Sequence, residues 1–255
     1  MALLTDGSPN TVETLKAIES SIADVAAIEM IDLDIKMGVA LEDLSESLMV
    51  YLIQLGPQDP QYLSRQRLGV STVVVTAPLR RWHAIQTIAL VYRDAYHNQL
   101  NERYLAKWKY FNAASSDARK TLLLTGLGMV NQGVPKAPAP VTGIAVGQWA
   151  SGEYVVQITW VDASGQEGSP SDPTTVALSV GNAPTVTAPA APSGIAGWNV
   201  YVAAIGSTPA LQNSSPLGFT VPWIGAVAGA VTGPPVGDGQ SPDRYIADIQ
   251  TFFRR

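Results

Sequence analysis

Residues Leu79–Phe111 read LRRWHAIQTIALVYRDAYHNQLNERYLAKWKYF and follow directly on Pro78. A proline suits the first turn of a helix, and neither glycine nor proline interrupts the stretch. Its large apolar and aromatic side chains recur at steps of three and four residues, which places them on one helix face. They are Trp82, Ile85, Ile88, Tyr92, Tyr96, Leu100, Tyr104, Trp108 and Phe111. We therefore predict one continuous helix, about 50 Å long at 1.5 Å per residue, whose apolar face is covered by other helices or by neighbouring copies.

Shorter apolar stripes on both sides predict further helices. The stripe over Thr11–Ile31 predicts a first helix capped by Thr11, and Gly38 separates it from a second helix over residues 41–55. A fourth helix is expected over Ser116–Thr125. Residues Val70–Thr76 are rich in β-branched side chains, so they form either a short extended segment or a coil that leads into the long helix.

The composition changes at Val134. The stretch VPKAPAPVTG, which begins there, is typical of a stiff linker, and after it Lys and Arg almost vanish. Apolar residues then alternate with polar ones, most clearly over Tyr154–Val161 and Trp198–Ala203, with turn residues between the segments. This pattern predicts a β-sandwich. The last residues, PDRYIADIQTFFRR from Pro242, have the spacing of a short helix or a docking tail.

The predicted fold class is therefore α + β and multidomain: an N-terminal α-helical bundle with one long helix, an antiparallel β-sandwich and a short C-terminal tail helix. The expected boundaries are 1–133 for the helical domain, 134–141 for the Pro-rich linker, 142–240 for the sandwich and 241–255 for the tail. Leu3 and Leu4 precede the turn-forming cluster Asp6–Pro9, so the N-terminus is either a short arm that docks on a neighbour or a frayed end.

Composition excludes several classes of protein. The 255 residues are 46% hydrophobic and 15% charged, which allows a sizeable core. No cysteine is present, so disulfides, a thiol nucleophile and Cys-ligated zinc are excluded. The sequence shows no basic, apolar leader and no apolar run long enough for a membrane span. A net charge of −5 argues against nucleic acid as the main partner.

Charge is divided between two blocks of the helical half. Up to Pro60 there are two basic residues against eleven acidic ones, whereas Gln61–Gly133 contains ten basic residues against three acidic ones. The two blocks pair either within one subunit or between subunits, where the acidic helices of one copy meet the basic helix of the next. Contacts of the second kind close into rings. The residues expected to pair with the acidic N-terminal helices are Arg80, Arg81, Arg93 and Arg103.

No catalytic, cofactor-binding or metal-ligating residues are predicted, and an enzyme is not expected. The two histidines, His83 and His97, lie roughly 20 Å apart on the predicted helix and cannot share a metal. Asp32 and Asp34 point apart on a helix and make a poor catalytic pair. The glycines of Gly126–Gly128 are not followed by the Lys-Ser/Thr of a phosphate loop.

The helical half resembles the head-to-tail adaptor, or connector, proteins of tailed bacteriophages. The resemblance covers Thr76–Ala118: a Leu/Trp start, Tyr-Arg-Asp in the middle, and Arg-Tyr four residues before Trp-Lys-Tyr-Phe. The second half is similar to the immunoglobulin- or fibronectin-type modules of phage structural proteins. That similarity lies in YVVQITWVDASGQEGSPSDP at 154–173, GWNVYVA at 197–203, LQNSSPLG at 211–218 and GPP at 233–235. The shortest adaptors lack such a second domain.

The resemblance implies a structural virion protein that forms a ring, of twelve copies if it follows the family and the symmetry of the portal. The portal would bind one end and the next tail or neck protein the other, while DNA passes through the lumen without specific binding. Its place would be the head–tail junction of the virion, assembled in the host cytoplasm and without contact to a membrane.

The residues expected at subunit or partner interfaces are aromatic anchors and arginines of the long stretch, together with the C-terminal tail. They are Trp82, Tyr92, Arg93, Tyr96, Arg103, Tyr104, Trp108, Tyr245, Phe252, Phe253, Arg254 and Arg255. The aromatic anchors are either core or interface residues. The tail either docks on the portal or a neighbour, or forms a helix that caps its own sandwich.

Two other functions compete with this interpretation. One is a tail-tip or baseplate protein whose sandwich binds host-surface carbohydrate through Trp149, Trp198, Tyr201 and Trp223, although the alternation places Trp198 in the core. The other is a tail-associated hydrolase, for which the sequence offers no carboxylate pair and no histidine cluster.

Overall fold

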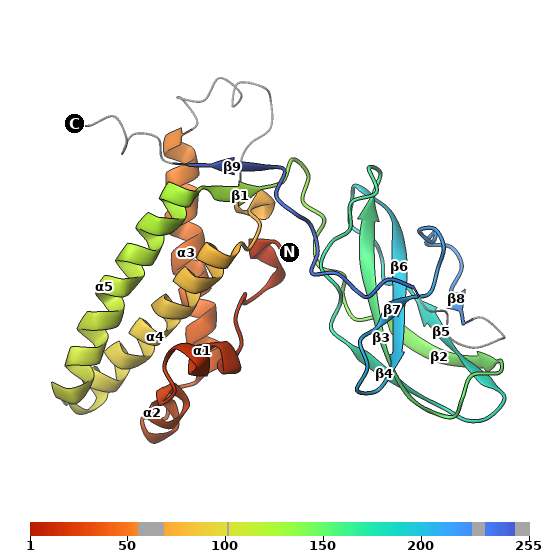
Figure 1. The fold of residues 1–255 in the computed structure, drawn as a ribbon, viewed down its shortest axis with the longest axis horizontal. Coiled ribbons are helices and arrows are strands. Elements are labelled where there is room, and N and C mark those ends of the chain that lie inside the picture. The colour runs from red at the N-terminus through yellow and green to blue at the C-terminus, as the bar shows by residue number, and fades with distance from the viewer. Residues whose placement is uncertain (56–68, 101, 226–232, 248–255) are drawn as a thin grey trace. The chain divides into compact units, whose positions relative to one another are not determined.

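The structure is a computed structural model that describes residues 1–55, 69–100, 102–225 and 233–247, and it divides into two compact units (Figure 1). The helical unit comprises Gly7–Asn131 and Pro242–Arg255, and the β unit comprises Met1–Asp6 and Gln132–Ser241. The predicted α + β class is confirmed, with helices in the N-terminal half and antiparallel strands in the C-terminal half.

The helical unit is built around one central helix, α4, which contacts every other α-helix described here. Its burial explains this position, since twelve of its 23 residues are buried. The five α-helices of the described residues are α1 (Val12–Ile18), α2 (Ile22–Ile28), α3 (Leu33–Leu55), α4 (Ala77–Gln99) and α5 (Glu102–Thr125). A 3-10 turn, η3 (Val70–Thr72), precedes α4.

The prediction of one continuous helix over Leu79–Phe111 is wrong. The helix ends at Leu100, which adopts a left-handed conformation (φ 51°, ψ 33°) and donates its N–H to the Tyr96 carbonyl at 2.6 Å. The chain then reverses into α5, and the two helices run side by side (Figure 1). The apolar periodicity is the same on both sides of the break. The hairpin lets the two apolar faces cover each other within one chain, whereas a single 50 Å helix would leave both open.

The expected helix boundaries before this hairpin are also wrong in two places. Thr11 does cap the first helix, since its hydroxyl accepts the Thr14 N–H at 3.4 Å. That helix ends at Ile18, however, and α2 follows as a separate helix. Gly38 lies inside α3; the break falls at Met30, with φ 55°, and Asp32 caps the new helix by accepting the N–H of residues 34 and 35. The predicted fourth helix, Ser116–Thr125, is the last part of α5.

A small sheet joins the end of α5 to the C-terminal segment. Strand β1 (Leu127–Met129) pairs antiparallel with β9 (Arg244–Ile246), and Val73 bridges Met129 on the other side. The space between these segments is tight: a Cβ at Gly128 would lie 2.8 Å from Thr76 Cγ2 and 2.9 Å from a Pro242 side-chain carbon. The predicted tail helix is therefore wrong for Arg244–Ile246, which forms a strand. Residues 248–255, with Phe252, Phe253, Arg254 and Arg255, lie outside the described residues.

The β unit contains two antiparallel sheets that share one core. One sheet has the order β2-β5-β8 and the other β4-β3-β6-β7. The strands are β2 (Val141–Val146), β3 (Gly152–Asp162), β4 (Thr174–Leu178), β5 (Asn182–Thr187), β6 (Ile195–Ala204), β7 (Ala210–Leu211) and β8 (Trp223–Ile224). The predicted alternation is confirmed in β3 and β6, whose apolar residues enter the core together with Ala183 and Val186 of β5. Trp160 and Trp198 face each other across these two strands, and both are fully buried.

The predicted linker 134–141 contributes to this unit rather than joining it to another. Val134 and Ala137 belong to the β core, each with 1% of its surface exposed, and Val141 already begins β2. The change in composition at Val134 therefore lies close to Gln132, where the main segment of this unit begins.

Candidate subunit interface

Three of the predicted aromatic anchors fill the core of their own helical unit. Trp82, Tyr92 and Tyr104 are 5%, 2% and 2% exposed. Tyr92 stacks on Phe111 at 5.7 Å between ring centroids, and Trp82 donates its Nε1–H to the Ser115 hydroxyl at 3.1 Å. In the hairpin they hold α5 against α4, so these three side chains have no surface left to offer a second copy.

Tyr96 and Trp108 lie nearer to the surface, at the turn end of the hairpin. Both are half-buried, and their rings stack at 6.0 Å between centroids. His97 is exposed and touches both rings. These three rings pack against one another at the turn end of the α4–α5 hairpin, and this packing accounts for their presence without a second copy of the chain.

Some of the acidic and basic residues of the helical unit form ion pairs within that unit, but the basic partners are lysines rather than the predicted arginines. Lys107 of α5 binds Glu19 at 2.7 Å, and Lys36 of α3 pairs with Asp94 of α4. Burial alone would raise the pKa of Glu19, but hydrogen bonds from Lys107 and Ser21 outweigh it and hold that pKa below its usual value. The hydrogen bond to Glu19 in turn raises the pKa of Lys107. This ion pair ties the region between α1 and α2 to α5.

The arginines predicted to serve as partners of the acidic helices have nearer contacts. Arg93 lies 3.4 Å from its neighbour Asp94. Arg103 donates to the Tyr104 hydroxyl and lies over that ring, with 4.4 Å between the guanidinium carbon and the ring centroid. The Tyr104 hydroxyl donates at 2.9 Å to Glu29, the residue that caps the C-terminal end of α2. Arg80 and Arg81 are both exposed at the start of α4.

One face of α3 presents both acidic and large apolar side chains to solvent. Glu42 and Glu46 are exposed, and neither has an ion-pair partner among the described residues. Met49 and Ile53 follow on the same face and are 49% and 65% exposed. The spacing of four, three and four residues aligns these side chains in one row. We call Glu42, Glu46, Met49 and Ile53 the α3 ridge.

A polar cleft of about 580 Å³ separates α3 from the α4–α5 hairpin. Its floor carries a directed chain of hydrogen bonds: the Ser115 hydroxyl donates to Gln86 Oε1 at 2.7 Å, and Gln86 Nε2 donates to Asp43 at 3.1 Å. On the α5 side the cleft is lined by Asn112, Ser116 and Arg119, and Arg119 reaches Ser47 of α3 at 3.0 Å. The buried Trp82 indole donates the first hydrogen bond of this series. The side chains that line the cleft therefore mainly hold α3 in position against the α4–α5 hairpin.

A second hollow, of about 360 Å³, lies between α4 and α5. Small side chains of α5 line it, with Arg81 and Ile85 from α4. We call this hollow the alanine groove; its lining is Pro78, Arg81, Ile85, Tyr110, Ala113, Ala114, Asp117, Ala118 and Thr121. Tyr110 is 66% exposed beside it. The sequence pattern did not reveal this groove, because alanines such as Ala113, Ala114 and Ala118 are common in any helix.

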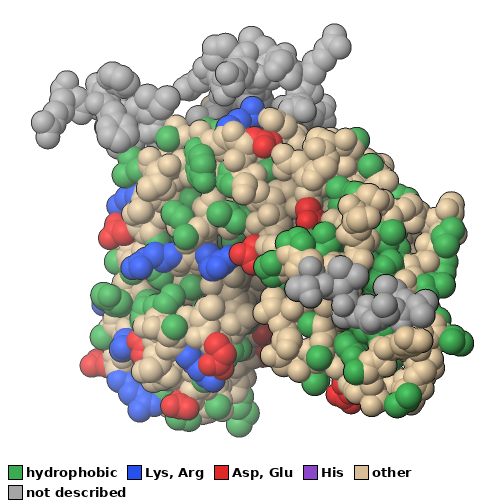
Figure 2. All heavy atoms as spheres, turned by 45° about the vertical axis from the view of Figure 1, so that its right-hand side comes forward, with side chains coloured by type: hydrophobic (Ala, Val, Ile, Leu, Met, Phe, Trp, Pro, Cys, Tyr) green, Lys and Arg blue, Asp and Glu red, His purple; other side chains and the backbone are tan. Residues whose placement is uncertain are grey.

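Charge is concentrated on the helical unit. On the face drawn in Figure 2, Lys and Arg side chains gather over the helical unit, whereas the β unit shows mainly hydrophobic and uncharged atoms. From Gln132 to Ser241 the sequence contains one lysine, no arginine and five acidic residues. Most of the charged side chains of the chain therefore belong to the helical unit.

His83 is held by hydrogen bonds inside the helical unit. His83 is fully buried, and its Nε2 lies 3.0 Å from the Met37 carbonyl, which can only accept. Nε2 therefore carries the proton and Nδ1 accepts from the Asn10 amide at 2.9 Å. Burial lowers the pKa of His83. Among the described residues, no three His, Asp or Glu side chains lie close enough together to hold a metal ion.

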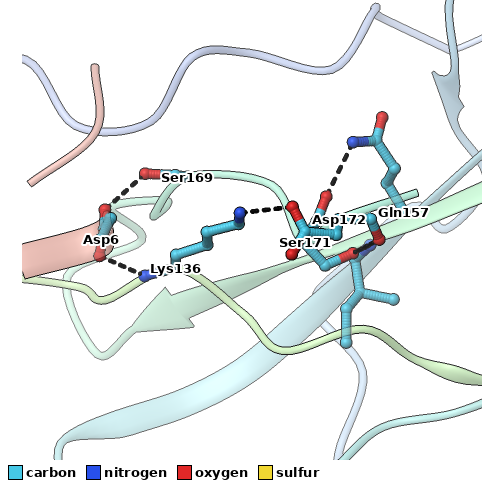
Figure 3. A network of polar contacts seen from close by, with 7 residues as sticks. Asp6, Lys136, Gln157, Ser169, Ser171 and Asp172 are labelled. Atoms are coloured by element: carbon cyan, nitrogen blue, oxygen red, sulfur yellow. Dashed lines mark hydrogen bonds and ion pairs between the residues drawn. The ribbon is translucent and has the colours of Figure 1, made fainter. Parts of the chain in front are cut away.

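The N-terminal arm docks on the β unit of its own chain. Leu3 and Leu4 are 3% and 2% exposed. The Asp6 carboxylate accepts the Lys136 N–H at 2.8 Å and the Ser169 hydroxyl at 2.7 Å (Figure 3). It also accepts the Leu3 N–H at 2.7 Å. The placement of residues 1–6 in the helical domain is therefore wrong, and the arm is neither frayed nor available to a neighbour. No local sequence pattern reveals this docking, because the Lys136 and Ser169 partners of Asp6 lie 130 and 163 residues away.

A second carboxylate organises the polar face of the β3–β6 pair. Glu167 accepts from the Tyr201 hydroxyl at 2.7 Å, from the Asn199 amide at 3.1 Å and from the Thr159 hydroxyl. Burial of Tyr201, together with its hydrogen bond to Glu167, raises the pKa of that phenol. Tyr201 is 3% exposed, so the cluster attaches the loop after β3 to the sheet rather than forming an open site.

The aromatic residues considered for carbohydrate binding are mostly inside the β unit. Trp149, Trp198 and Tyr201 are 3%, 0% and 3% exposed, and Trp223 is half-buried against Trp149. The expectation that Trp198 is a core residue is confirmed. These four side chains do not form an open stacking platform.

Of the tail residues, the structure places Tyr245 in β9, where its side chain is 58% exposed. None of the described helices has a run of apolar residues that would span a bilayer. No model of a known protein family matches this chain, and comparison with curated proteins returns no match.

Proposed function

We propose that this chain is a structural protein of a tailed-phage virion that assembles head to tail into a ring at the head–tail junction. One observation of the molecule supports the proposal: the helical unit exposes two unlike surfaces, an acidic and apolar α3 ridge and a groove lined by small side chains and Arg81. Unlike surfaces favour heterologous contacts, and such contacts close into rings when the rotation between copies allows it.

In this proposal the ring has no catalytic role. The portal binds one end, the next tail or neck protein binds the other, and DNA passes through the lumen without specific contacts. Twelve copies would follow the symmetry of the connector family that the helical half resembles. The tail beyond β9 is a further portal-docking candidate, because it ends in Phe252, Phe253, Arg254 and Arg255. Assembly would take place in the host cytoplasm.

The mass of the assembly tests the proposal. The full chain is studied by native mass spectrometry over a range of concentrations, alone and with the portal protein of the virus that encodes it. A single closed multiple of the 27.0 kDa chain, formed alone or on the portal, is the expected result. A trimer would indicate a fibre or baseplate protein, and a monomer that never binds the portal would refute the proposal.

A further inference from the structure

We propose that the α3 ridge of one copy packs into the alanine groove of the next copy. This inference rests on the proposed ring and names the two surfaces that form its repeated contact. The occupant of the groove is thus a second copy of this chain, presented through Glu42, Glu46, Met49 and Ile53.

The shapes of the two surfaces are complementary. Helices pack most closely when a row of large side chains on one enters a depression lined by small side chains on the other. On the ridge, Met49 and Ile53 are large and about half exposed or more. In the groove, Ala113 and Ala114 leave the backbone of α5 open to close approach. Burying these side chains removes exposed apolar surface from water, which favours association.

The charges of the two surfaces are complementary as well. Helix α3 contains four acidic residues and one lysine, and that lysine already pairs with Asp94. Helix α5 contains five basic residues and two acidic ones. Arg81 lines the groove and has no ion-pair partner among the described residues. The one acid in the groove, Asp117, lies 3.3 Å from Lys120.

The ridge cannot enter the groove of its own chain. The residues of α5 that line the polar cleft, beside α3, are 112, 115, 116 and 119, whereas those that line the groove are 110, 113, 114, 117, 118 and 121. At 100° per residue the two sets fall on opposite sides of α5. Helix α3 therefore lies on one side of the α4–α5 layer and the groove opens on the other.

This placement also decides against a two-fold dimer. A symmetric contact between two α3 ridges would bury Glu42 and Glu46 without a basic partner, because the ridge contains no lysine or arginine. In the ridge-to-groove contact each copy uses one ridge and one groove. An open row of copies therefore leaves a ridge uncovered at one end and a groove uncovered at the other. Only a closed ring covers every ridge and every groove.

Cysteine cross-linking tests the contact directly, because the natural chain contains no cysteine. Four double variants combine Met49→Cys or Ile53→Cys on the ridge with Ala113→Cys or Thr121→Cys in the groove. After mild oxidation of the assembled protein, at least one is expected to give a ladder of covalent oligomers on a denaturing gel. Single-cysteine variants stop at the dimer.

The matched control pairs Met49→Cys with Asn112→Cys. Asn112 is exposed and adjacent to Ala113, but it lines the cleft on the α3 side of α5. This control is expected to give no ladder. If the native mass shows a ring and none of the four double variants cross-links, the ridge-to-groove contact is wrong while the ring stands. If no ring forms under any condition, the proposed function itself fails.

Charge reversal gives an independent readout. Glu42→Lys with Glu46→Lys should weaken assembly about tenfold, measured as the concentration at half-assembly, because attraction across the contact becomes repulsion. Adding Arg81→Glu, which reverses the basic residue that lines the groove, should recover part of the lost assembly, because the added acid meets the lysines introduced at positions 42 and 46. A triple variant that assembles no better than the double variant would overturn the proposal.

Discussion

At the scale of single residues, His83 shows how a buried polar group fixes neighbouring segments. Its ring receives the Asn10 amide on one side and donates to the Met37 carbonyl of α3 on the other. Asn10 also donates to the carbonyl of Arg80 at 2.8 Å. Three stretches of the helical unit thus meet at one imidazole, and both of its nitrogens are used. If Nδ1 were protonated, its N–H would face the Asn10 amide N–H, and two hydrogen-bond donors would oppose each other.

We therefore expect the helical unit to lose stability as the pH falls below 6.5. Burial lowers the pKa of folded His83 from 6.5, so the unfolded chain binds the proton more readily than the folded one. The contribution of this group is complete above pH 6.5 and falls by at most about 1.4 kcal/mol for each pH unit below it. Urea unfolding between pH 8 and 5.5 measures the slope.

The variant His83→Gln should flatten that slope while it lowers stability at pH 8. His97→Gln is the control, because His97 is exposed on α4. Equal slopes in the natural chain and the His83→Gln variant would show that another group controls the pH dependence.

At the scale of elements, the sequence predicts helix faces better than helix ends. The stripe of Leu79–Phe111 did identify the apolar faces of α4 and α5, since Tyr92 and Phe111 are both buried. It did not locate the reversal at Leu100, because that residue has no intrinsic preference for a left-handed turn. The reversal is favoured only once the two faces meet, which is a tertiary effect.

The same competition between a local pattern and tertiary contacts explains why the predicted C-terminal helix is wrong for residues 244–246. Tyr245, Ile246 and Ile249 have helical spacing, yet residues 244–246 pair with β1. A short isolated helix is marginal in water, and an available strand edge offers hydrogen bonds that a local pattern does not reveal. Long-range pairing is therefore where sequence reasoning about this chain was weakest, and alternation within β3 and β6 is where it was strongest.

Two glycines allow a matched test at this scale. Gly38 lies inside α3, and a Cβ there would meet no atom within 4 Å. Gly38→Ala should therefore stabilise the protein by about 0.5–1 kcal/mol through helix propensity. Gly128→Ala should destabilise it, because its Cβ would lie 2.8 Å from Thr76 Cγ2. Thermal unfolding of both variants measures the two signs, and a destabilising Gly38→Ala would mean that α3 needs a break at that residue.

At the scale of the whole molecule, the composition change at Val134 lies close to the observed boundary at 131/132. What the sequence did not reveal is that both ends of the chain belong to the unit that is distant in sequence. Met1–Asp6 belongs to the β unit, and Pro242 onward belongs to the helical unit. The determinant at the N-terminus is a single carboxylate, Asp6, whose turn-forming neighbours suggested only a local role.

Removing that carboxylate should loosen the N-terminal arm. Asp6→Ala removes the acceptor for the Lys136 N–H and the Ser169 hydroxyl, and the expected loss is about 1–3 kcal/mol. Asp172→Ala is the matched control: it removes the exposed ion pair with the Lys136 side chain and should cost less than about 1 kcal/mol. Hydrogen exchange of the amides of Leu3 and Leu4 measures the loosening, and equal protection in Asp6→Ala and the natural chain would contradict it.

The passage of the chain from one unit to the other at 6/7, 131/132 and 241/242 has a consequence for inheritance. No uninterrupted stretch of the gene encodes either unit completely. A recombination event that moved residues 132–241 alone would leave the first six codons behind, and with them Leu3, Leu4 and Asp6. A transferred segment of this kind would therefore encode a β unit without two of its buried leucines and without the carboxylate that accepts from Lys136 and Ser169.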